Sequence, residues 1–202
     1  MSKLFVISAP SGAGKTSLVR ALLERRPQLV VSVSHTTRKP RAHEVDGRDY
    51  YFVSPAQFED MVQQRSFLEH ARVFDNYYGT GAEQVRERLA AGREMVLEID
   101  WQGAQQVRRV MPDCVTIFIL PPSRTALQQR LQARRTDSPE IIARRLADAV
   151  TDMSHYREFD YVVVNDHFEQ AVLDLMAILD GNGQALRADR PALGPLVGQL
   201  LS

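Results

Sequence analysis

Short apolar runs alternate with amphipathic segments along most of the chain. Helices are predicted where charged residues are spaced among apolar ones, at Ser17–Arg25, Ala82–Ala91 and Gly103–Val110. Runs rich in Val, Ile and Leu predict buried strands at Leu4–Ser8, Leu29–Val33, Met95–Ile99, Val115–Leu120 and Tyr161–Val164. This alternation favours an α/β fold with right-handed crossovers and a parallel sheet covered by helices on both faces.

One stretch that departs from the alternation covers residues 34–80. It is dense in Arg, His and Tyr, and it predicts short strands at Tyr50–Val53 and Phe67–Phe74 around a helix at Pro55–Gln64. We interpret it as a small mixed α/β insertion that serves a ligand.

A second departure lies at residues 124–145, which carry six arginines around the turn-like segment Thr-Asp-Ser-Pro at 136–139. Two helices joined by a mobile lid are predicted there. The final segment, Pro191–Leu201, predicts a terminal helix to which we attach no function.

The chain of 202 residues has a formal net charge of +0 and a pI of about 7.0. A coat for nucleic acid or a polybasic membrane surface needs an excess of Lys and Arg, so we expect neither kind of partner. Cys114 is the single cysteine, and the apolar run after Lys3 is too short for a signal peptide. We therefore expect a cytoplasmic protein, and a homo-oligomer stays open.

A glycine-rich segment, Ala-Pro-Ser-Gly-Ala-Gly-Lys-Thr at 9–16, lies between the first predicted strand and the first predicted helix. Such a loop turns backbone N–H groups toward a phosphate, and the next helix points its positive end at the same place. Lys15 would reach the β- and γ-phosphates of ATP, and the Thr16 hydroxyl would bind Mg²⁺. The pattern has Gly at position 9, where this chain has Ala. The alternative is a tight turn that binds no ligand.

Several further segments follow that loop in a fixed order. They are Ser-His-Thr-Thr-Arg-Lys-Pro-Arg from Ser34, Glu-Val-Asp-Gly-Arg-Asp-Tyr from Glu44, Phe-Leu-Glu from Phe67, Asn-Tyr-Tyr-Gly-Thr from Asn76 and Glu-Ile-Asp-Trp-Gln-Gly from Glu98. Together with the loop they closely resemble the guanylate kinase family, from Leu4 to about Asp180. The resemblance implies a P-loop kinase that transfers a phosphoryl group from ATP to GMP, and to dGMP.

The resemblance also implies roles for individual residues. The ATP and Mg²⁺ site would comprise Ser11, Gly12, Ala13, Gly14, Lys15, Thr16, Ser17, Arg130, Arg134 and Asn165, with Glu98 meeting the metal through water. The GMP phosphate would be held by Arg38, Arg41, Tyr50 and Tyr78, and guanine by Ser34, Glu69, Thr80 and Asp100. Catalysis would rest on Lys15, Arg38, Arg134 and Arg145. The regions would be a P-loop core at 1–33, 81–124 and 146–202, a GMP-binding region at 34–80 and a lid at 125–145.

The chemistry of the two carboxylates fits guanine. Guanine presents donors at N1 and N2, so Glu69 and Asp100 can accept from it, whereas the lone pair of adenine N1 would face them repulsively. Three positions depart from the family pattern: Glu98 stands for an Asp, and His43 and Arg135 stand where Gly is frequent. The histidines show no spacing typical of metal ligands.

Two rival hypotheses remain at this point. A guanylate-kinase-like module without activity would use the same pocket for phosphorylated protein segments. Another P-loop kinase, acting for example on a phosphorylated sugar, would need Lys15 but would not need Glu69 and Asp100 to read a base.

Overall fold

A computed structural model describes residues 3–73, 75–133 and 138–202. The helices are α1 (Lys15–Arg25), α2 (Pro55–Gln63), α3 (Ala82–Ala90), α4 (Trp101–Val110), α5 (Arg124–Ala133), α6 (Pro139–Ser154), α7 (Phe168–Leu179) and α8 (Gly194–Leu201). The strands are β1 (Leu4–Ser8), β2 (Leu29–Val31), β3 (His35–Thr36), β4 (Tyr51–Phe52), β5 (Phe67–Val73), β6 (Asn76–Gly81), β7 (Glu94–Glu98), β8 (Val115–Leu120) and β9 (Tyr161–Val164). Short 3₁₀ helices cover His155–Glu158, Gln184–Leu186 and Pro191–Leu193.

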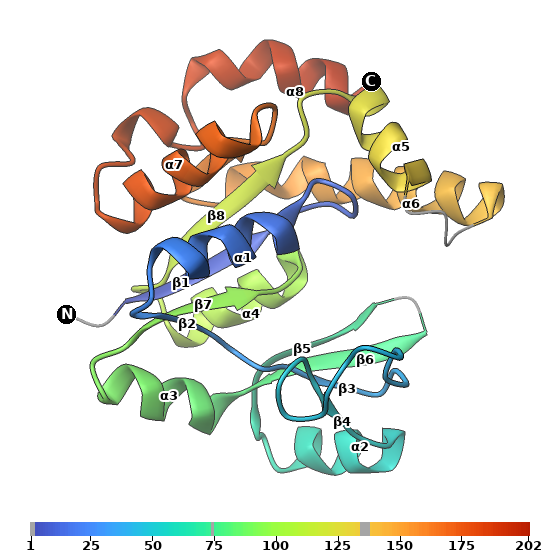
Figure 1. Ribbon diagram of the computed structural model, residues 1–202, viewed down its shortest axis with the longest axis vertical. Coiled ribbons are helices and arrows are strands. Elements are labelled where there is room, and N and C mark those ends of the chain that lie inside the picture. Colours follow the sequence, from blue (N-terminus) through green and yellow to red (C-terminus); the bar gives the residue numbers. More distant parts are fainter. Residues whose placement is uncertain (1–2, 74, 134–137) are drawn as a thin grey trace. The chain divides into compact units, whose positions relative to one another are not determined.

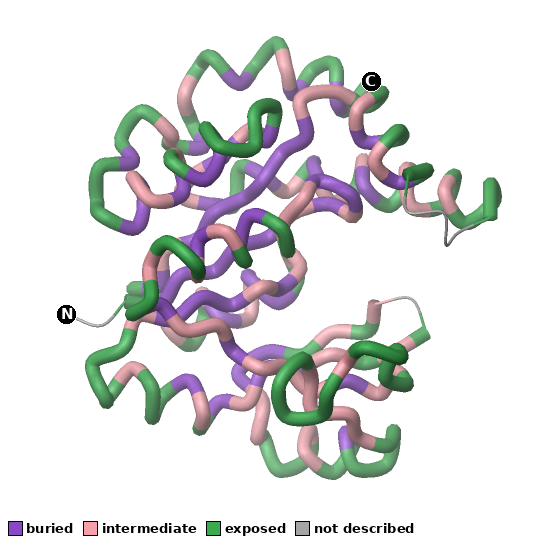
Figure 2. The backbone as a smooth tube through the Cα atoms, viewed as in Figure 1, coloured by how far each residue is buried: buried purple, intermediate pink, exposed green. Residues whose placement is uncertain are grey.

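The larger of two sheets has five strands in the order β2-β7-β1-β8-β9. β2 runs parallel to β7, with Leu29 opposite Glu94, and β8 runs parallel to β9, with Ile117 opposite Tyr161. Its strands are mostly buried, as Figure 2 shows. Near-continuous apolar runs are what a parallel strand covered on both faces requires. The predicted α/β class, with a parallel sheet and flanking helices, is confirmed.

The chain divides into two compact units, which we describe separately. The first contains Met1–Phe5 and Gln28–Cys114, and the second contains Val6–Pro27 and Val115–Ser202.

In the second unit, α1 follows the end of β1 and packs against α7 (Figure 1). Leu18, Val19 and Leu22 form the buried face of α1. At the other end of this helix, Arg25 pairs with Glu169 and Arg26 with Asp180, in ion pairs with N–O distances of 2.5 Å. These contacts fix the helix that begins at the glycine-rich loop.

The first unit contains a four-stranded sheet in the order β4-β3-β6-β5, with α2 beside it (Figure 1). β3 runs parallel to β4, and β6 runs antiparallel to both β3 and β5. The register between β5 and β6 shifts between Phe67 and Glu69, so Leu68 and Glu69 are both buried. A β-bulge of this kind re-aims a side chain, and here it turns a carboxylate inward.

Helix starts follow local capping chemistry. α2 begins with a capping box in which Ser54 and Gln57 bond each other's backbone N–H groups, and Pro55 occupies the first turn. Ser138 caps α6 by accepting from the Ile141 N–H, and the helix begins at Pro139.

Several elements differ from the sequence predictions. The sequence analysis missed α7, β3 and β6, although five buried apolar residues of α7 recur at helical spacing. Helix α6 continues nine residues beyond the predicted lid, to Ser154. The terminal segment starts with a 3₁₀ turn, Pro191–Leu193, before α8, because Pro195 fits only the first turn of an α-helix.

Among the described residues, no helix combines the length and the apolar character that crossing a bilayer requires.

Candidate functional site

The glycine-rich loop joins β1 to α1 within the second unit. Gly12 and Gly14 have φ angles of +90° and +93°, the left-handed region that side chains disfavour. Gly14 is the N-cap of α1 and provides no side chain, and the first turn of the helix has no acidic residue. The positive end of the helix is therefore suited to an anion, with Lys15 and Thr16 in its first turn. Ser17 is exposed in that turn, and Ser11 is half-buried in the loop.

Two distant residues hold the carbonyl of Ala13 in this loop. The Asn165 side-chain amide donates to the Ala13 oxygen at 2.7 Å, and the Arg130 guanidinium donates to the same oxygen at 3.4 Å. Arg130 also donates to the Asn165 carbonyl at 2.9 Å. A Cβ on Gly14 would lie 2.5 Å from Asn165 Nδ2. Three predicted site residues, at 13, 130 and 165, thus meet around one carbonyl.

Ala9, where the sequence pattern has Gly, fits its place without strain. Arg65 is the only non-glycine residue at positive φ within the described ranges, so Ala9 keeps an ordinary backbone angle.

In the first unit, Glu69 and Thr80 form a buried polar pair. The Thr80 hydroxyl donates to Glu69 Oε1 at 2.6 Å, and the two residues lie opposite each other on β5 and β6. Asp100 caps α4 by accepting from the Gly103 N–H at 2.7 Å. A Cβ on Gly103 would stand 2.6 Å from Glu69 Oε2 and 3.2 Å from Asp100 Oδ1. The two carboxylates therefore converge on one glycine and form a local group of acceptors.

Gln106, which the sequence analysis did not select, joins α4 to β5. Its side-chain carbonyl accepts from the His70 N–H at 3.1 Å, and its amide donates to the His70 carbonyl at 2.9 Å. Because His70 follows Glu69, these two bonds join the strand that carries Glu69 to the helix that Asp100 caps. The signal in the sequence is only a glutamine on a helix, which many surface helices share.

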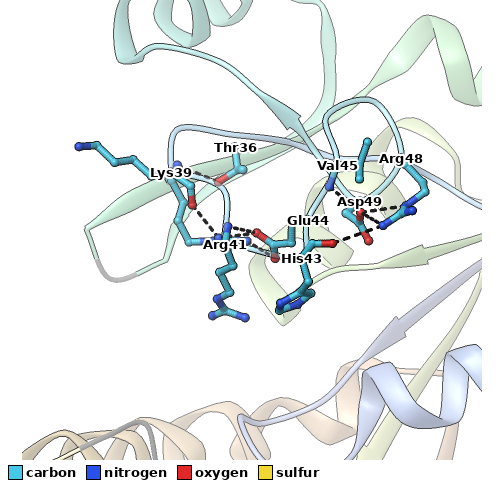
Figure 3. Close-up of polar contacts among 9 residues, drawn as sticks. Thr36, Lys39, Arg41, His43, Glu44, Val45, Arg48 and Asp49 are labelled. Carbon is cyan, nitrogen blue, oxygen red and sulfur yellow. Dashed lines mark hydrogen bonds and ion pairs between the residues drawn. The ribbon is translucent and has the colours of Figure 1, made fainter.

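Arg38 pairs with Glu44, a residue to which no sequence motif assigned a role. Two hydrogen bonds of 2.9 Å join the guanidinium to the carboxylate, and Figure 3 shows the surrounding loop. The bonds from Arg38 hold the pKa of Glu44 at about 2, and Glu44 in turn raises the pKa of Arg38. The guanidinium carbon lies 5.3 Å from the ring centre of Tyr50 and 5.8 Å from that of Phe52.

The two tyrosines predicted to bind the acceptor phosphate lie together. The rings of Tyr50 and Tyr78 meet edge-on with centres 6.1 Å apart, and a hydrogen bond to Tyr78 further raises the pKa of Arg38. Burial raises the pKa of Tyr50, and the charge of Glu98, the last residue of β7, adds to this rise. Tyr50 thus stays protonated and able to donate a hydrogen bond at physiological pH. Glu98 lies close enough to Tyr50 for its charge to act on the phenol.

The other predicted site residues have fewer contacts with the groups described above. Arg41 is exposed and contacts the group through its backbone N–H, which donates to Glu44. The backbone carbonyl of Ser34 accepts from Tyr51, which joins it to β4. Arg145 lies half-buried on α6. Arg134 and Arg135 lie outside the described residues.

No group of three or more His, Cys, Asp or Glu side chains is arranged to hold a metal ion in the described part of the chain. Thr16, whose hydroxyl the sequence motif predicts as a magnesium ligand, is exposed at the start of α1.

Comparisons with known proteins agree over nearly the whole chain. The family model for guanylate kinase matches residues 1–182. A guanylate kinase of Methylococcus capsulatus is 59% identical over 198 residues, which cover 98% of this chain and 97% of that protein. A guanylate kinase of Escherichia coli K12 is 49% identical over 201 residues, with 98% and 97% covered.

A solved structure gives the same answer. The crystal structure of guanylate kinase from Anaplasma phagocytophilum superposes with a TM-score of 0.74 at 32% identity, over 97% of this chain and 93% of that one. With the fold, the order of the motifs and this extent of identity in agreement, the chain belongs to the guanylate kinase family.

Proposed function

We propose that this enzyme transfers the γ-phosphoryl group of ATP to GMP, giving GDP and ADP in purine nucleotide metabolism, and that dGMP also serves as acceptor. The observation that carries the proposal is the group formed by the buried pair Glu69 and Thr80 with the half-buried Asp100 in the first unit. A P-loop alone fits many kinases, whereas two carboxylates set for a donor-rich edge favour guanine. The family match supports the same acceptor.

The base site selects by hydrogen bonding and by repulsion. Glu69 is 4% exposed and accepts from the Thr80 hydroxyl, and we assign this carboxylate to the guanine N1 or N2 donor. Asp100 would accept from the second donor. Adenine N1 would place a lone pair against these carboxylates instead of a donor, which costs several kcal/mol, or on the order of 10⁴-fold in selectivity.

The acceptor phosphate would be bound by Arg38, Arg41, Tyr50 and Tyr78. The reacting oxygen of GMP is already ionised at neutral pH, so the step needs no strong general base. That oxygen attacks the γ-phosphorus in line, the new P–O bond forms, and the bond to the ADP oxygen breaks. The main barrier is the repulsion between two polyanions, roughly 4 kcal/mol for each close pair of charges at an effective dielectric of 20.

The chain's own cations would lower this barrier. Lys15 would lie beside the β- and γ-phosphates, while backbone N–H groups at 12–16 hold the β-phosphate. Arg130 is already engaged with the loop, so we assign it to holding the loop in shape as well as to the ATP site. Arg145 and Arg134 would neutralise the transferred group, and closure of the lid at 125–145 would exclude water.

Mg²⁺ fits the donors that the chain provides. When bound, it would neutralise charge between the β- and γ-phosphates. Thr16 would be its protein ligand, and Glu98 would contact it through water. This cation, together with ATP, completes the proposed set of cofactors.

We propose a cytoplasmic location, which the nucleotide substrates and the buried single Cys114, expected in a reducing compartment, both support. The proposed regions stay those of the sequence analysis: the core, the GMP-binding region 34–80 and the lid.

A coupled assay tests the proposal. The full chain is supplied with ATP and Mg²⁺ and, in parallel, with GMP, dGMP, AMP, UMP or ribose bisphosphate. We expect turnover on GMP and dGMP only. Binding of GMP without turnover would favour the non-catalytic module, and turnover on ribose bisphosphate would favour a sugar-phosphate kinase.

A further inference from the structure

The Glu44 carboxylate accepts hydrogen bonds from three N–H groups of the loop at residues 38–49, which we call the acceptor loop. Oε1 accepts from Arg38 Nη2, and Oε2 accepts from Arg38 Nη1 and from the Arg41 backbone N–H at 2.8 Å. Although most of the acceptor loop is exposed, only 7% of the Glu44 side chain is. One carboxylate thus connects both arginines assigned to the acceptor phosphate.

Arg38 is fixed on several further sides. Its Nη1 also donates to the Lys39 carbonyl at 2.8 Å, and its backbone N–H donates to the Thr36 hydroxyl at 3.2 Å. The rings of Tyr50 and Phe52 lie within cation–π distance of the guanidinium. The side chain is 18% exposed. A flexible arginine is thereby held in one position before any ligand arrives.

The remaining donors of Arg38 decide what this arrangement does. A guanidinium has five N–H donors. Glu44 and Lys39 use both hydrogens of Nη1 and one of Nη2. The Nε–H and the second hydrogen of Nη2 are left on a different edge, and Tyr78 is also a hydrogen-bonding neighbour of this guanidinium.

An acidic residue bonded to a phosphate-binding arginine could compete with the phosphate for that arginine. The hydrogen bonds of Arg38 argue against such competition by Glu44, because a phosphate can bind the remaining edge of the guanidinium without displacing the carboxylate. Arg41 supplies the charge that the neutralised Arg38 does not. Its guanidinium forms no ion pair within the described ranges, and in Figure 3 its side chain extends away from Glu44.

We infer that Glu44 is a positioning residue for the phosphate acceptor: it orients Arg38 so that Nε–H and Nη2–H face the phosphate of GMP. The inference rests on the proposed function, since it assigns Glu44 a part in that acceptor site. Preorganisation of this kind strengthens binding by removing the cost of ordering a long side chain. Glu44 itself stays ionised across the physiological range because Arg38 lowers its pKa.

The test uses Glu44→Gln in the full chain, with kinetics for both substrates. Glutamine keeps the length and one acceptor oxygen but loses the charge and one bond of the fork. We expect the KM for GMP to rise about tenfold, while the KM for ATP stays within about twofold. Guanosine, which lacks the phosphate, should inhibit the variant and the wild type equally.

Asp49→Asn is the matched control. Asp49 lies in the same loop and accepts from the Val45 N–H and from Arg48, but it does not contact Arg38. It should leave the KM for GMP within about twofold of wild type. Glu44→Asp keeps the charge but is one methylene shorter, and it should give an intermediate loss. If thermal unfolding shows that Glu44→Gln does not fold, Glu44→Asp serves as the test variant instead.

Three results would overturn the inference. They are unchanged GMP binding in Glu44→Gln, tighter GMP binding, which would make Glu44 a competitor, and an equal loss for guanosine, which would make its role purely structural. Failure of the proposed function is a separate result, in which the wild-type protein would not phosphorylate GMP. Separate binding titrations with GMP and with guanosine would still measure the effect of Glu44→Gln.

Discussion

The two proposed phosphate sites of this chain differ in the groups that would bind phosphate. In the second unit, the loop before α1 offers the main chain, two glycines at positive φ and a helix start without a side-chain cap. In the first unit, the proposed acceptor site would use the side chains of Arg38, Arg41, Tyr50 and Tyr78. The first kind of site is specified by about eight consecutive residues, and the second by contacts between segments.

This difference changes how each site fails. A main-chain site depends on backbone angles, so a single methyl group in the wrong place can destroy it. A side-chain site depends on orientation, so its loss is graded and depends on the partners of each residue. The changes below test this contrast.

Lys15→Met should have the largest effect. It removes the cation assigned to the β- and γ-phosphates and leaves the backbone turn unchanged, so kcat should fall about 10³-fold. GMP affinity, measured by titration without ATP, should stay close to that of wild type because Lys15 is in the other unit. Normal turnover in this variant would remove the loop from the ATP site.

Gly14→Ala should act through the backbone and cost about 10²-fold in kcat/KM for ATP. The new Cβ would lie 2.5 Å from Asn165 Nδ2 and would need φ near +93°. Gly92→Ala is a matched control, since Gly92 has φ +78° with nothing within 4 Å of its added Cβ. The control should lose about 1 kcal/mol of stability and no activity. Equal losses of activity in both variants would contradict the specific role of the loop.

Glu69→Gln should weaken GMP binding by about tenfold, because the amide loses the negative charge and puts an NH₂ donor in place of one acceptor oxygen. In contrast to Glu44→Gln, the loss should be equally large for guanosine, since this carboxylate is assigned to the base. Glu59→Gln, on the exposed face of α2, is the control. Isothermal titration with both ligands measures the contrast, and unchanged affinity would exclude Glu69 from the base site.

The smallest expected effect is on stability at acid pH. The folded pKa of Glu44 is about 2 against an ordinary value of 4.5. The carboxylate therefore contributes stability that is fully present above about pH 4.5 and is lost as the pH falls toward 2. Urea unfolding of wild type and Glu44→Gln should differ by about 1 kcal/mol at pH 6, and the difference should shrink below pH 4.5 and vanish as the pH reaches about 2. A difference that is independent of pH would mean that the ion pair does not stabilise the fold.

The sequence was informative where the signal was local. The strands at Val115–Leu120 and Tyr161–Val164 have the predicted bounds, because continuous apolar runs admit few alternatives. The loop at 9–16 joins a strand to a helix as predicted, since its glycines determine its angles. The assigned roles of the site residues stay predictions until they are measured.

The pattern of the sequence could not predict contacts between distant segments of the chain. The register shift that buries Glu69 depends on β6, a strand of mixed polarity that the sequence analysis missed. Gln106 and Glu44 act through bonds to a backbone and to a side chain elsewhere, and neither residue type is distinctive on a surface. Such supporting residues are visible only once the fold brings their partners to them.

The bond from Asn165 to Ala13 has a consequence for how the protein is made. The two residues are 152 positions apart, and the second unit is assembled from an early and a late segment of the chain. At roughly 5 to 20 residues per second, a ribosome needs on the order of 8 to 30 s to deliver Asn165 after Ala13 has been joined. During that interval the nascent loop lacks its late-arriving support, so nucleotide capture should begin only when translation is nearly finished.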